Sequence, residues 1–409
     1  MATAWLDGVR AAASARTWVI LVLVLLSRMG IALGNQSLPA LAPFLRAELG
    51  LSRAALGTLF VVDRLAGALT IVQGGLLADR FGARHLMAWG AILTGFGLFA
   101  LALAHSVGAA LPGLVLIGVG VSVGSPAGTL AIVHWFKPRQ RGTAMGLKQT
   151  SVPLGAIIAA LTIPPVAVTL GWRGAVVGLG ALAVVCGVAV VIAYPEHHSV
   201  TQRSLSTTGR WGLDLLRRRN VLVACAYGFV MGAMNTTMLG YFLIYLTEVL
   251  RADVVIAGWL LAGAQVGGLV SRMLWGLLSD RWFGGRRRET LALISAVGTA
   301  TVLYLGFAGA GTPLALMALL SLSIGISIFG WQPMHLTVTP EQVDGEQRGR
   351  AIGLSSFILQ IGQVIGPPVF GFAADQTGSY RLGCLVLATL GALVTTLTVV
   401  GLQERPGRV

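Results

Sequence analysis

Charged residues are scarce in this chain of 409 residues. Asp, Glu, Lys and Arg make up 11% of it, whereas hydrophobic residues make up 55%. A soluble globular domain carries about a quarter charged residues, so this chain has too few to cover a surface that faces water. With a mean hydropathy of +0.81, the composition excludes both an ordinary soluble protein and a disordered chain, and it predicts a protein that spans a bilayer.

Cysteines and acidic residues are also few. Cys186, Cys225 and Cys384 lie within apolar runs without metal-ligand spacing, which predicts small core residues and neither a disulfide nor a metal site. The 29 Lys and Arg outnumber the 15 Asp and Glu, for a net charge of +14. Of the 29, 20 fall in one set of alternating loops and tails, five in the other set and four within apolar runs. This asymmetry follows the positive-inside rule, so the charge orients the protein in the membrane, and no nucleic-acid partner is expected.

Twelve apolar runs follow one another, each near the roughly 20 residues that a membrane-spanning helix needs. They predict helices at 17–44, 53–78, 85–105, 110–135, 143–169, 173–194, 220–248, 254–279, 289–309, 312–337, 349–374 and 380–402. We therefore expect an N-terminal six-helix bundle at 1–194, a cytoplasmic loop at 195–219 and a C-terminal six-helix bundle at 220–409. The even number of spans and the basic loops place both termini of this multi-pass inner (plasma) membrane protein in the cytoplasm.

The two halves of the chain repeat each other. GGLLADRFGAR at 74–84 returns as GLLSDRWFGGRRR at 276–288, and RGTAMGL at 141–147 returns as RGRAIGL at 348–354. Duplicated six-helix halves are typical of secondary transporters, which bind substrate near the bilayer midplane between the halves. The repeats therefore predict a transporter.

GGLLADRFGAR resembles the signature loop of the major facilitator superfamily, and the resemblance extends over essentially the whole chain. It implies an all-α membrane protein of twelve transmembrane helices in two six-helix bundles related by pseudo-two-fold symmetry. A monomer is the default expectation, and no cofactor is expected. In that family the loop is a gate, which implies gating roles for Gly75, Asp79, Arg80, Gly82 and Arg84, and for Asp280 and Arg281 in the second copy. The alternative is that these charges only fix the topology. The second copy carries an extra residue at Trp282–Phe283.

Five charged residues lie inside the predicted spans away from their ends: Arg28, Asp63, Arg64, Lys148 and Arg272. Such residues are costly in a bilayer and usually mark a substrate or proton pathway. Asp63 can neutralise only one of the four cations, and the excess favours a small organic anion, above all a carboxylate, which Arg binds with two parallel hydrogen bonds.

The individual roles of the cations leave alternatives open. Arg272 lies in SRMLWGLLSD, which resembles the eighth helix of carboxylate carriers, so it is expected to bind substrate. Arg28 either binds substrate or pairs with Asp63, and Arg64 is equally open. Lys148 is expected to bind substrate because its counterpart in the second repeat is Ser355, so the fold does not require a charge there.

Asp63 is the only acid that lies inside a predicted span away from its ends, so it is the candidate for proton coupling, with Arg64 as its neighbour. It could carry a proton at neutral pH only if a nearby arginine released it, and substrate capture of that arginine would couple the two events. Uncharged polar residues could complete the substrate site, with hydrogen bonds between helices as the alternative role: Asn35, Gln149, Asn235, Tyr241, Gln332 and Gln360.

Within the superfamily, SRMGIALGNQSLPALAPFLRAELGLS at 27–52 is similar to the first helix of the anion:cation symporters, which import organic anions with protons. Two positions depart from that family: Ser27 replaces a frequent acid, and Leu114 stands near where an arginine is usual. Cyanate-type and monocarboxylate transporters are other possible relatives. A proton-driven drug exporter is the main alternative, although SVPLGAII at 151–158 lacks the GPxxGG pattern of such exporters. A receptor without transport is a further alternative, and no motif predicts an enzyme.

Overall fold

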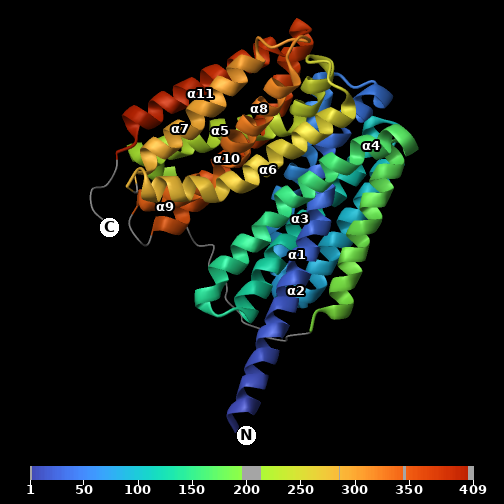
Figure 1. Cartoon of the computed structure of the whole chain (residues 1–409), viewed down its shortest axis with the longest axis vertical. Helices are drawn as coiled ribbons and strands as arrows, with labels where there is room; N and C mark the ends of the chain where they lie inside the picture. Colours follow the sequence, from blue (N-terminus) through green and yellow to red (C-terminus); the bar gives the residue numbers. More distant parts are fainter. Residues whose placement is uncertain (1, 196–212, 285, 344–346, 404–409) are drawn as a thin grey trace. The chain divides into compact units, whose positions relative to one another are not determined.

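The computed structural model describes residues 2–195, 213–284, 286–343 and 347–403 (Figure 1). Within helices, the side chains of residues 2–16, 72, 75, 76, 78, 79, 138, 139, 142 and 349 are not described. In the described ranges the chain forms helices and no strand: α1 (Ala2–Leu49), α2 (Arg53–Ala102), α3 (Val107–Trp135), α4 (Pro138–Ala193), η1 (Leu213–Arg217), α5 (Arg219–Glu248), α6 (Val254–Arg281), α7 (Arg287–Leu305), α8 (Leu314–Ile324), η2 (Gly325–Phe329), α9 (Gln332–Glu341), α10 (Arg348–Thr377) and α11 (Arg381–Gly401).

Two of these helices each contain two predicted spans. α2 breaks at Gly82 (φ 79°, ψ 165°) and α4 breaks at Gly171 (φ 78°, ψ 151°). A side chain would strain the backbone at a positive φ, so glycine allows the direction of the chain to change there without a loop. The tenth predicted span is divided differently, because one turn of π-helix, η2, joins α8 to α9.

Ten segments of the described residues are long and apolar enough to cross a membrane. One of the ten, Thr143–Ala193, has 51 residues and contains two predicted spans, one on each side of Gly171. The ninth predicted span corresponds to α7, which is not among the ten segments. The described helices thus cover all twelve predicted spans, which confirms the all-α membrane fold.

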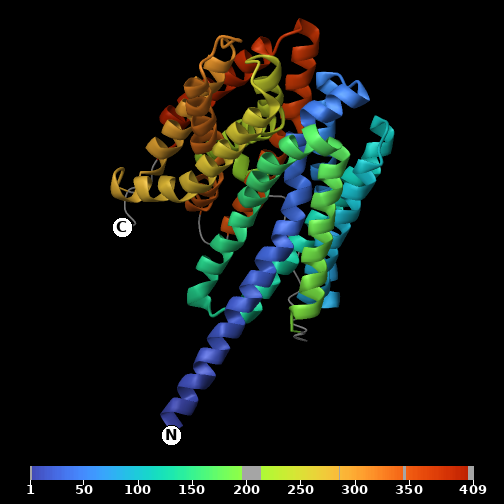
Figure 2. The same cartoon turned by 45° about the vertical axis from the view of Figure 1, so that its right-hand side comes forward.

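The chain forms two compact units. Unit 1 comprises Met1–Leu38 and Val62–Arg203, and unit 2 comprises Pro39–Val61 and Ser204–Val409. Figures 1 and 2 show α1, α3 and α4 side by side in unit 1. The bundle boundaries at 194 and 220 stay a prediction. Residues 39–61, which belong to the N-terminal half of the sequence, are part of unit 2. We call this segment, the end of α1 and the start of α2, the 39–61 hairpin.

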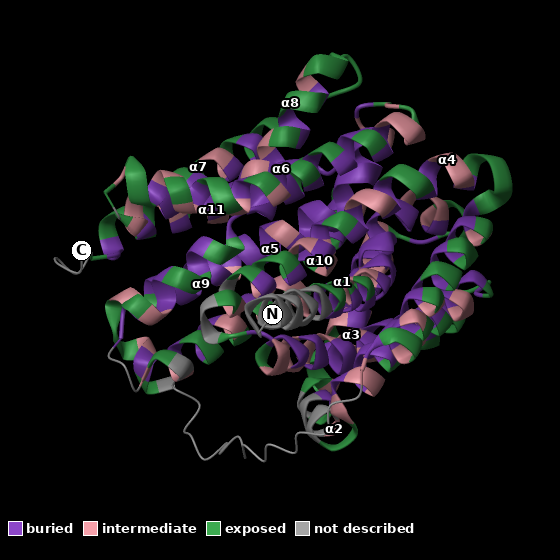
Figure 3. Ribbon diagram, turned by 60° about the horizontal axis from the view of Figure 1, so that its bottom comes forward, coloured by how far each residue is buried: buried purple, intermediate pink, exposed green. Residues whose placement is uncertain are grey.

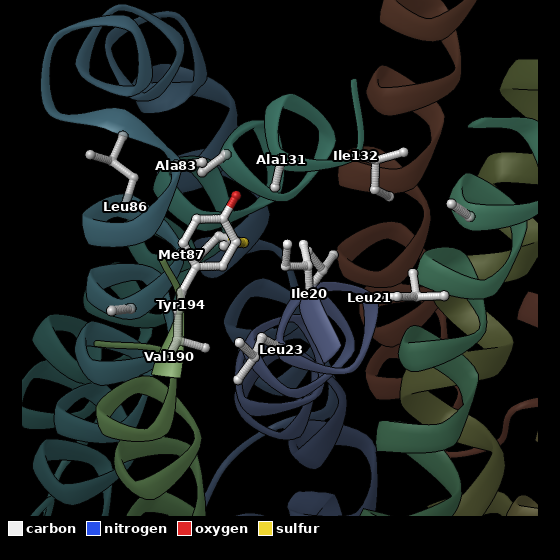
Figure 4. Packing of buried hydrophobic residues seen from close by; sticks show 14 of the residues in the cluster. Ile20, Leu21, Leu23, Ala83, Leu86, Met87, Ala131, Ile132, Val190 and Tyr194 are labelled. Carbon is white, nitrogen blue, oxygen red and sulfur yellow. The ribbon is translucent and has the colours of Figure 1, made fainter. Parts of the chain in front are cut away.

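The core of unit 1 joins its four helices. Ile20 of α1, Met87 of α2, Ala131 of α3 and Val190 of α4 belong to one buried cluster, in which the ring of Tyr194 lies beside Met87 (Figure 4). Small residues allow such helices to approach closely where lipid provides no hydrophobic driving force.

In unit 2 the central helix is α5, which is buried along most of its length (Figure 3). It packs against α10 and α11, whereas α6 packs against α8 and η2. A smaller cluster that includes Leu215, Cys225 and Leu354 lies where η1, α5 and α10 meet. Cys225 and the other two cysteines are buried free thiols, in agreement with the core role expected for them.

Candidate functional site

Lys148 lies on α4 with its side chain buried in unit 1. Its Nζ donates to Thr129 Oγ1 at 2.5 Å and to the carbonyl of Ser125 at 3.3 Å, both on α3. These acceptors are neutral, and Lys148 forms no ion pair within the described part of the chain. The ammonium group is therefore held in place without being neutralised.

Arg28 is a second unneutralised cation in unit 1. It is half-buried on α1, and its Nε is shielded from solvent without a hydrogen-bond partner. The alternative pairing of Arg28 with Asp63 is not found among the described contacts. Two cations of unit 1 that have no carboxylate partner among the described residues favour a bound anion.

Asp63 pairs instead with Asn35. The Asn35 amide donates to Asp63 Oδ2, and Gln36 Nε2 donates to Asn35 Oδ1 at 2.7 Å. Asp63 is buried, and its other carboxylate oxygen, Oδ1, has no hydrogen-bond partner. The neighbouring Arg64 is half-buried. Oδ1 is therefore free to accept a proton without loss of the Asn35 bond.

Arg272 is the corresponding cation in unit 2. It lies on α6, half-buried, with a shielded Nε that lacks a partner among the described residues. Its helix is fixed by Trp275, whose Nε1 donates to the carbonyl of Ile326 at 2.7 Å. Asn235 of α5 donates to the carbonyl of Ile328 at 2.7 Å. Both bonds end on η2, where the π-helical turn changes the usual carbonyl pairing.

The other predicted polar site residues occupy varied environments. Tyr241 is buried on α5 and donates to the carbonyl of Arg53 in the 39–61 hairpin. Gln149 and Gln332 are exposed, and Gln360 is exposed with only a 3.5 Å contact to the carbonyl of Ser356. For these residues, a substrate role stays a prediction.

The first signature loop contains the break at Gly82. Arg84 Nε donates to the carbonyl of Val191 near the end of α4 at 2.9 Å, and Arg80 is exposed with its guanidinium 5.4 Å from the centre of the Phe81 ring. The gating predictions for Gly75 and Asp79 lie outside the described side chains.

In the second copy of the loop, Asp280 forms an ion pair with Arg287 at 2.7 Å, and Arg281 is exposed. The Arg287 guanidinium also donates to Ser279 Oγ at 2.8 Å. Arg287 Nε also lies 3.8 Å from Glu341 Oε2 at the end of α9, so the contacts extend beyond the loop and the two helices that it joins. The gating role predicted for both copies stays a prediction.

Sequence reasoning missed the residues that hold the in-span charges. Ser125 and Thr129 are four residues apart, one helical turn, in the span before Lys148, and a hydroxyl at this spacing was the available signal. The charged contacts of the 39–61 hairpin were missed as well, because their partners are distant in sequence. No group of His, Cys, Asp and Glu in the described part of the chain is arranged to hold a metal ion.

Comparisons with known proteins agree with this architecture. The model of the Major Facilitator Superfamily matches residues 20–241 and 225–408. The chain is 28% identical to the "Probable sulfoacetate transporter SauU" of Cupriavidus necator, over 90% of this chain and 91% of that protein. It is 25% identical to the "Hexuronate transporter" of Bacillus subtilis, over 90% of both chains.

The fold is also that of a solved transporter structure. The nucleoside transporter NupG superimposes with a TM-score of 0.79 at 13% identity, over 94% of this chain and 100% of that one. Such low identity shows a common fold alone. Together with the family match over nearly the whole sequence, it establishes that this chain is a membrane transporter and belongs to the major facilitator superfamily.

Proposed function

We propose that the protein is a secondary active transporter that imports a small organic anion together with protons, by alternating access. The observation that carries this proposal is the set of three cations, Arg28, Lys148 and Arg272, that have no carboxylate partner among the described residues. The names of the relatives, which include sulfoacetate and hexuronate carriers, support the same substrate class.

The unneutralised charge of Lys148 supports an anionic ligand. A lysine at the centre of a membrane helix costs about 2.5–3.5 kcal/mol on insertion scales, and less near the start of a span, where Lys148 lies. Its bonds to Thr129 and to the carbonyl of Ser125 contribute about 1.5–3 kcal/mol each, because the donor is charged, and so offset the cost of burial without neutralising the charge. A bound carboxylate or sulfonate would neutralise the ammonium group and add charge-assisted hydrogen bonds.

Asp63 is proposed as the proton-coupling residue. Its unpartnered Oδ1 would accept the proton, and the bond from Asn35 to Oδ2 would persist in either protonation state. The protonated side chain would no longer attract Arg64 or a nearby cation, so proton binding would change how strongly those cations bind the anion. We further propose that the protein is monomeric, with both termini in the cytoplasm.

Uptake by purified protein in proteoliposomes tests the function. Labelled sulfoacetate, glucuronate and lactate are supplied with and without an inward proton gradient, and glucose serves as the neutral control. We expect gradient-driven accumulation of at least one anion and none of glucose. Extrusion of cationic dyes without anion uptake would instead favour a drug exporter, and binding without flux would favour a receptor.

Two variants assign the roles. Arg272→Gln is expected to reduce anion uptake by about 10-fold or more, because one charge-assisted contact contributes about 1.5–3 kcal/mol. Arg251→Gln is the matched control, since Arg251 is exposed in the turn between α5 and α6. Asp63→Asn is expected to abolish the dependence of uptake on the proton gradient, and uphill uptake by this variant would rule out Asp63 as the coupling residue.

A further inference from the structure

One face of the second half of α2 carries exposed apolar side chains. Phe81 and Trp89 are each 41% exposed. The same face continues with Phe96 and Leu103, which are also exposed. The helix turns its other face, with the fully buried Met87, to the core of unit 1 (Figure 4). In a protein that spans a bilayer, an exposed apolar stripe of this length is covered by lipid chains.

His85 is the polar residue at the loop end of this stripe. Its ring centre lies 6.1 Å from that of Trp89, and its Nδ1 lies 3.1 Å from the carbonyl oxygen of Phe81. A carbonyl oxygen only accepts, so Nδ1 carries the hydrogen of this bond. In the neutral ring the other nitrogen, Nε2, is then an acceptor, and it has no hydrogen-bond partner in the described part of the chain.

Arg80 places a positive charge at the same end of the stripe. It is exposed, its guanidinium lies 5.4 Å from the centre of the Phe81 ring, and that ring lies 5.4 Å from the ring of Trp89. Arg80 forms no ion pair with a described side chain, a set that does not include the neighbouring acid Asp79. We call Arg80, Phe81, His85 and Trp89 the Arg80–Trp89 cluster.

The Arg80–Trp89 cluster lies at the end of a membrane span. The apolar segment Arg80–Ala102 begins at its first residue. Each polar layer of a bilayer is about 5–7 Å thick, and His85 and Trp89 are about 6 Å apart along the helix. The cluster therefore extends from the lipid headgroups to the start of the lipid chains, the depth at which tryptophan is enriched in membrane proteins.

We propose that the Arg80–Trp89 cluster binds an anionic phospholipid whose headgroup carries a hydroxyl group, of the phosphatidylglycerol class. The guanidinium of Arg80 pairs with the phosphate, and the headgroup hydroxyl donates to His85 Nε2. The rings of Phe81 and Trp89 contact the start of the lipid chains. Phosphatidylcholine has neither a net negative charge nor a headgroup hydrogen to donate, so it meets neither requirement. The inference does not depend on the proposed cargo.

Photo-crosslinking of the full-length protein tests the site. The protein is purified in detergent and mixed with a trace of phosphatidylglycerol that carries a photoreactive group at the start of one acyl chain. We expect crosslinks within residues 81–96, mapped by mass spectrometry. Unlabelled phosphatidylglycerol should compete about 5-fold better than phosphatidylcholine, the preference that one basic residue gives for an anionic lipid.

Phosphatidylethanol tests the acceptor role of His85. This lipid has the phosphodiester charge of phosphatidylglycerol without the headgroup hydroxyl. At about pH 8, where an ordinary histidine is neutral, phosphatidylglycerol should compete about 2- to 5-fold better than phosphatidylethanol, the effect of one neutral hydrogen bond. In His85→Phe, which keeps an aromatic ring and removes both nitrogens, the two lipids should compete equally. His105→Phe is the matched control, because His105 is exposed in the turn after the same span and should leave the preference unchanged.

Variants of Arg80 test the charge. Arg80→Gln should weaken competition by phosphatidylglycerol and by phosphatidylethanol alike, by about 5-fold, and should keep the difference between them. Arg80→Lys keeps the charge and should restore most of the loss. Arg251→Gln is the control, since Arg251 is exposed in the turn between α5 and α6, far from α2 in sequence.

Four results would overturn the inference. They are competition by phosphatidylcholine as strong as by phosphatidylglycerol, crosslinks that lie outside residues 81–96, and equal competition by phosphatidylglycerol and phosphatidylethanol in the unsubstituted protein. The fourth is competition by soluble glycerol phosphate as strong as by the lipid, because the exposed rings would then contribute nothing to binding.

Discussion

Each unit contains a buried polar contact at the equivalent place in its repeat, but only one of the two contacts is charged. In unit 1, Lys148 of α4 bonds to Thr129 of α3. In unit 2, Ser355 of α10 bonds to Nε2 of His335 on α9 at 2.8 Å. Lys148 follows RGTAMGL directly, and Ser355 follows RGRAIGL directly.

The contact between Ser355 and His335 in unit 2 joins two helices without a charge. Ser355 and His335 are both fully buried, and the His335 ring stacks on Tyr227 with centres 6.0 Å apart and planes 19° apart. A neutral hydrogen bond is therefore sufficient to join these two helices. A charge at this place in the repeat is therefore not a general requirement of the fold, and this supports the proposed role of Lys148 in substrate binding.

Placing a lysine at the equivalent position of unit 2 should have the largest effect on stability. Ser355→Lys would place an ammonium group in a fully buried site beside His335, without a carboxylate partner. An uncompensated buried charge destabilises by about 3–5 kcal/mol, so we expect a large fall in Tm or no folded protein. Thermal unfolding of the purified protein measures this, and a Tm equal to that of the unsubstituted protein would show that the two sites are not distinct.

Removing the histidine should cost stability and little transport. His335→Ala eliminates the bond to Ser355 and the ring contacts with Tyr227 and Trp331, and a cavity of this size costs about 2–4 kcal/mol. We expect a lower Tm with uptake per folded molecule within about twofold of the unsubstituted protein. A loss of uptake at unchanged Tm would assign a function to the site in unit 2.

Removing Lys148 should reduce transport without loss of stability. Lys148→Met keeps the length of the side chain and removes the buried charge, so we expect an equal or higher Tm. Labelled sulfoacetate uptake should fall by about 10-fold or more, since one charge-assisted contact is lost. Unchanged uptake, or a Tm that falls as far as in His335→Ala, would contradict the substrate role.

The smallest effect is expected at the residue that positions Lys148. Thr129→Val removes the hydroxyl acceptor at nearly constant volume and leaves only the 3.3 Å contact to Ser125. We expect a KM about 2- to 5-fold higher with kcat and Tm little changed, because the cation is still present but less well oriented. Thr162→Val is the matched control, as Thr162 is exposed on α4 and bonds only to its own helix. Equal KM values in the two variants would show that Thr129 does not orient Lys148.

Much of the fold could be predicted from the sequence because the bilayer imposes it. Apolar runs and basic loops predicted the twelve spans, and the repeated motifs predicted the two related halves. The signature loop was located by its sequence alone, and the structure has a positive φ at Gly82 within it. The neutral partners of Lys148 could not be predicted, because the sequence does not show which side chain a hydroxyl in a neighbouring span contacts.

The 39–61 hairpin contacts were beyond the sequence for a different reason. Arg46 lies between the first two predicted spans and Arg53 begins the second, whereas Glu248 ends the seventh predicted span and Asp375 follows the eleventh. In the structure Glu248 forms an ion pair with Arg46 and lies 3.4 Å from Arg53 Nη2, and Asp375 Oδ1 accepts from the Arg53 amide at 2.9 Å. Their pairing depends on which repeat the hairpin packs against, which is a property of conformation. Local pattern does not encode it.

The separation of charge at the 39–61 hairpin makes its contacts sensitive to salt. Arg46 and Arg53 lie on one side, and the carboxylates of Glu248 and Asp375 lie on the other. The distance over which such charges attract each other falls from about 30 Å at 0.01 M salt to about 3 Å at 1 M. These contacts should therefore be strongest in dilute buffer and weakest in molar salt, so the buffer used in purification sets how firmly the hairpin is held when the protein is imaged.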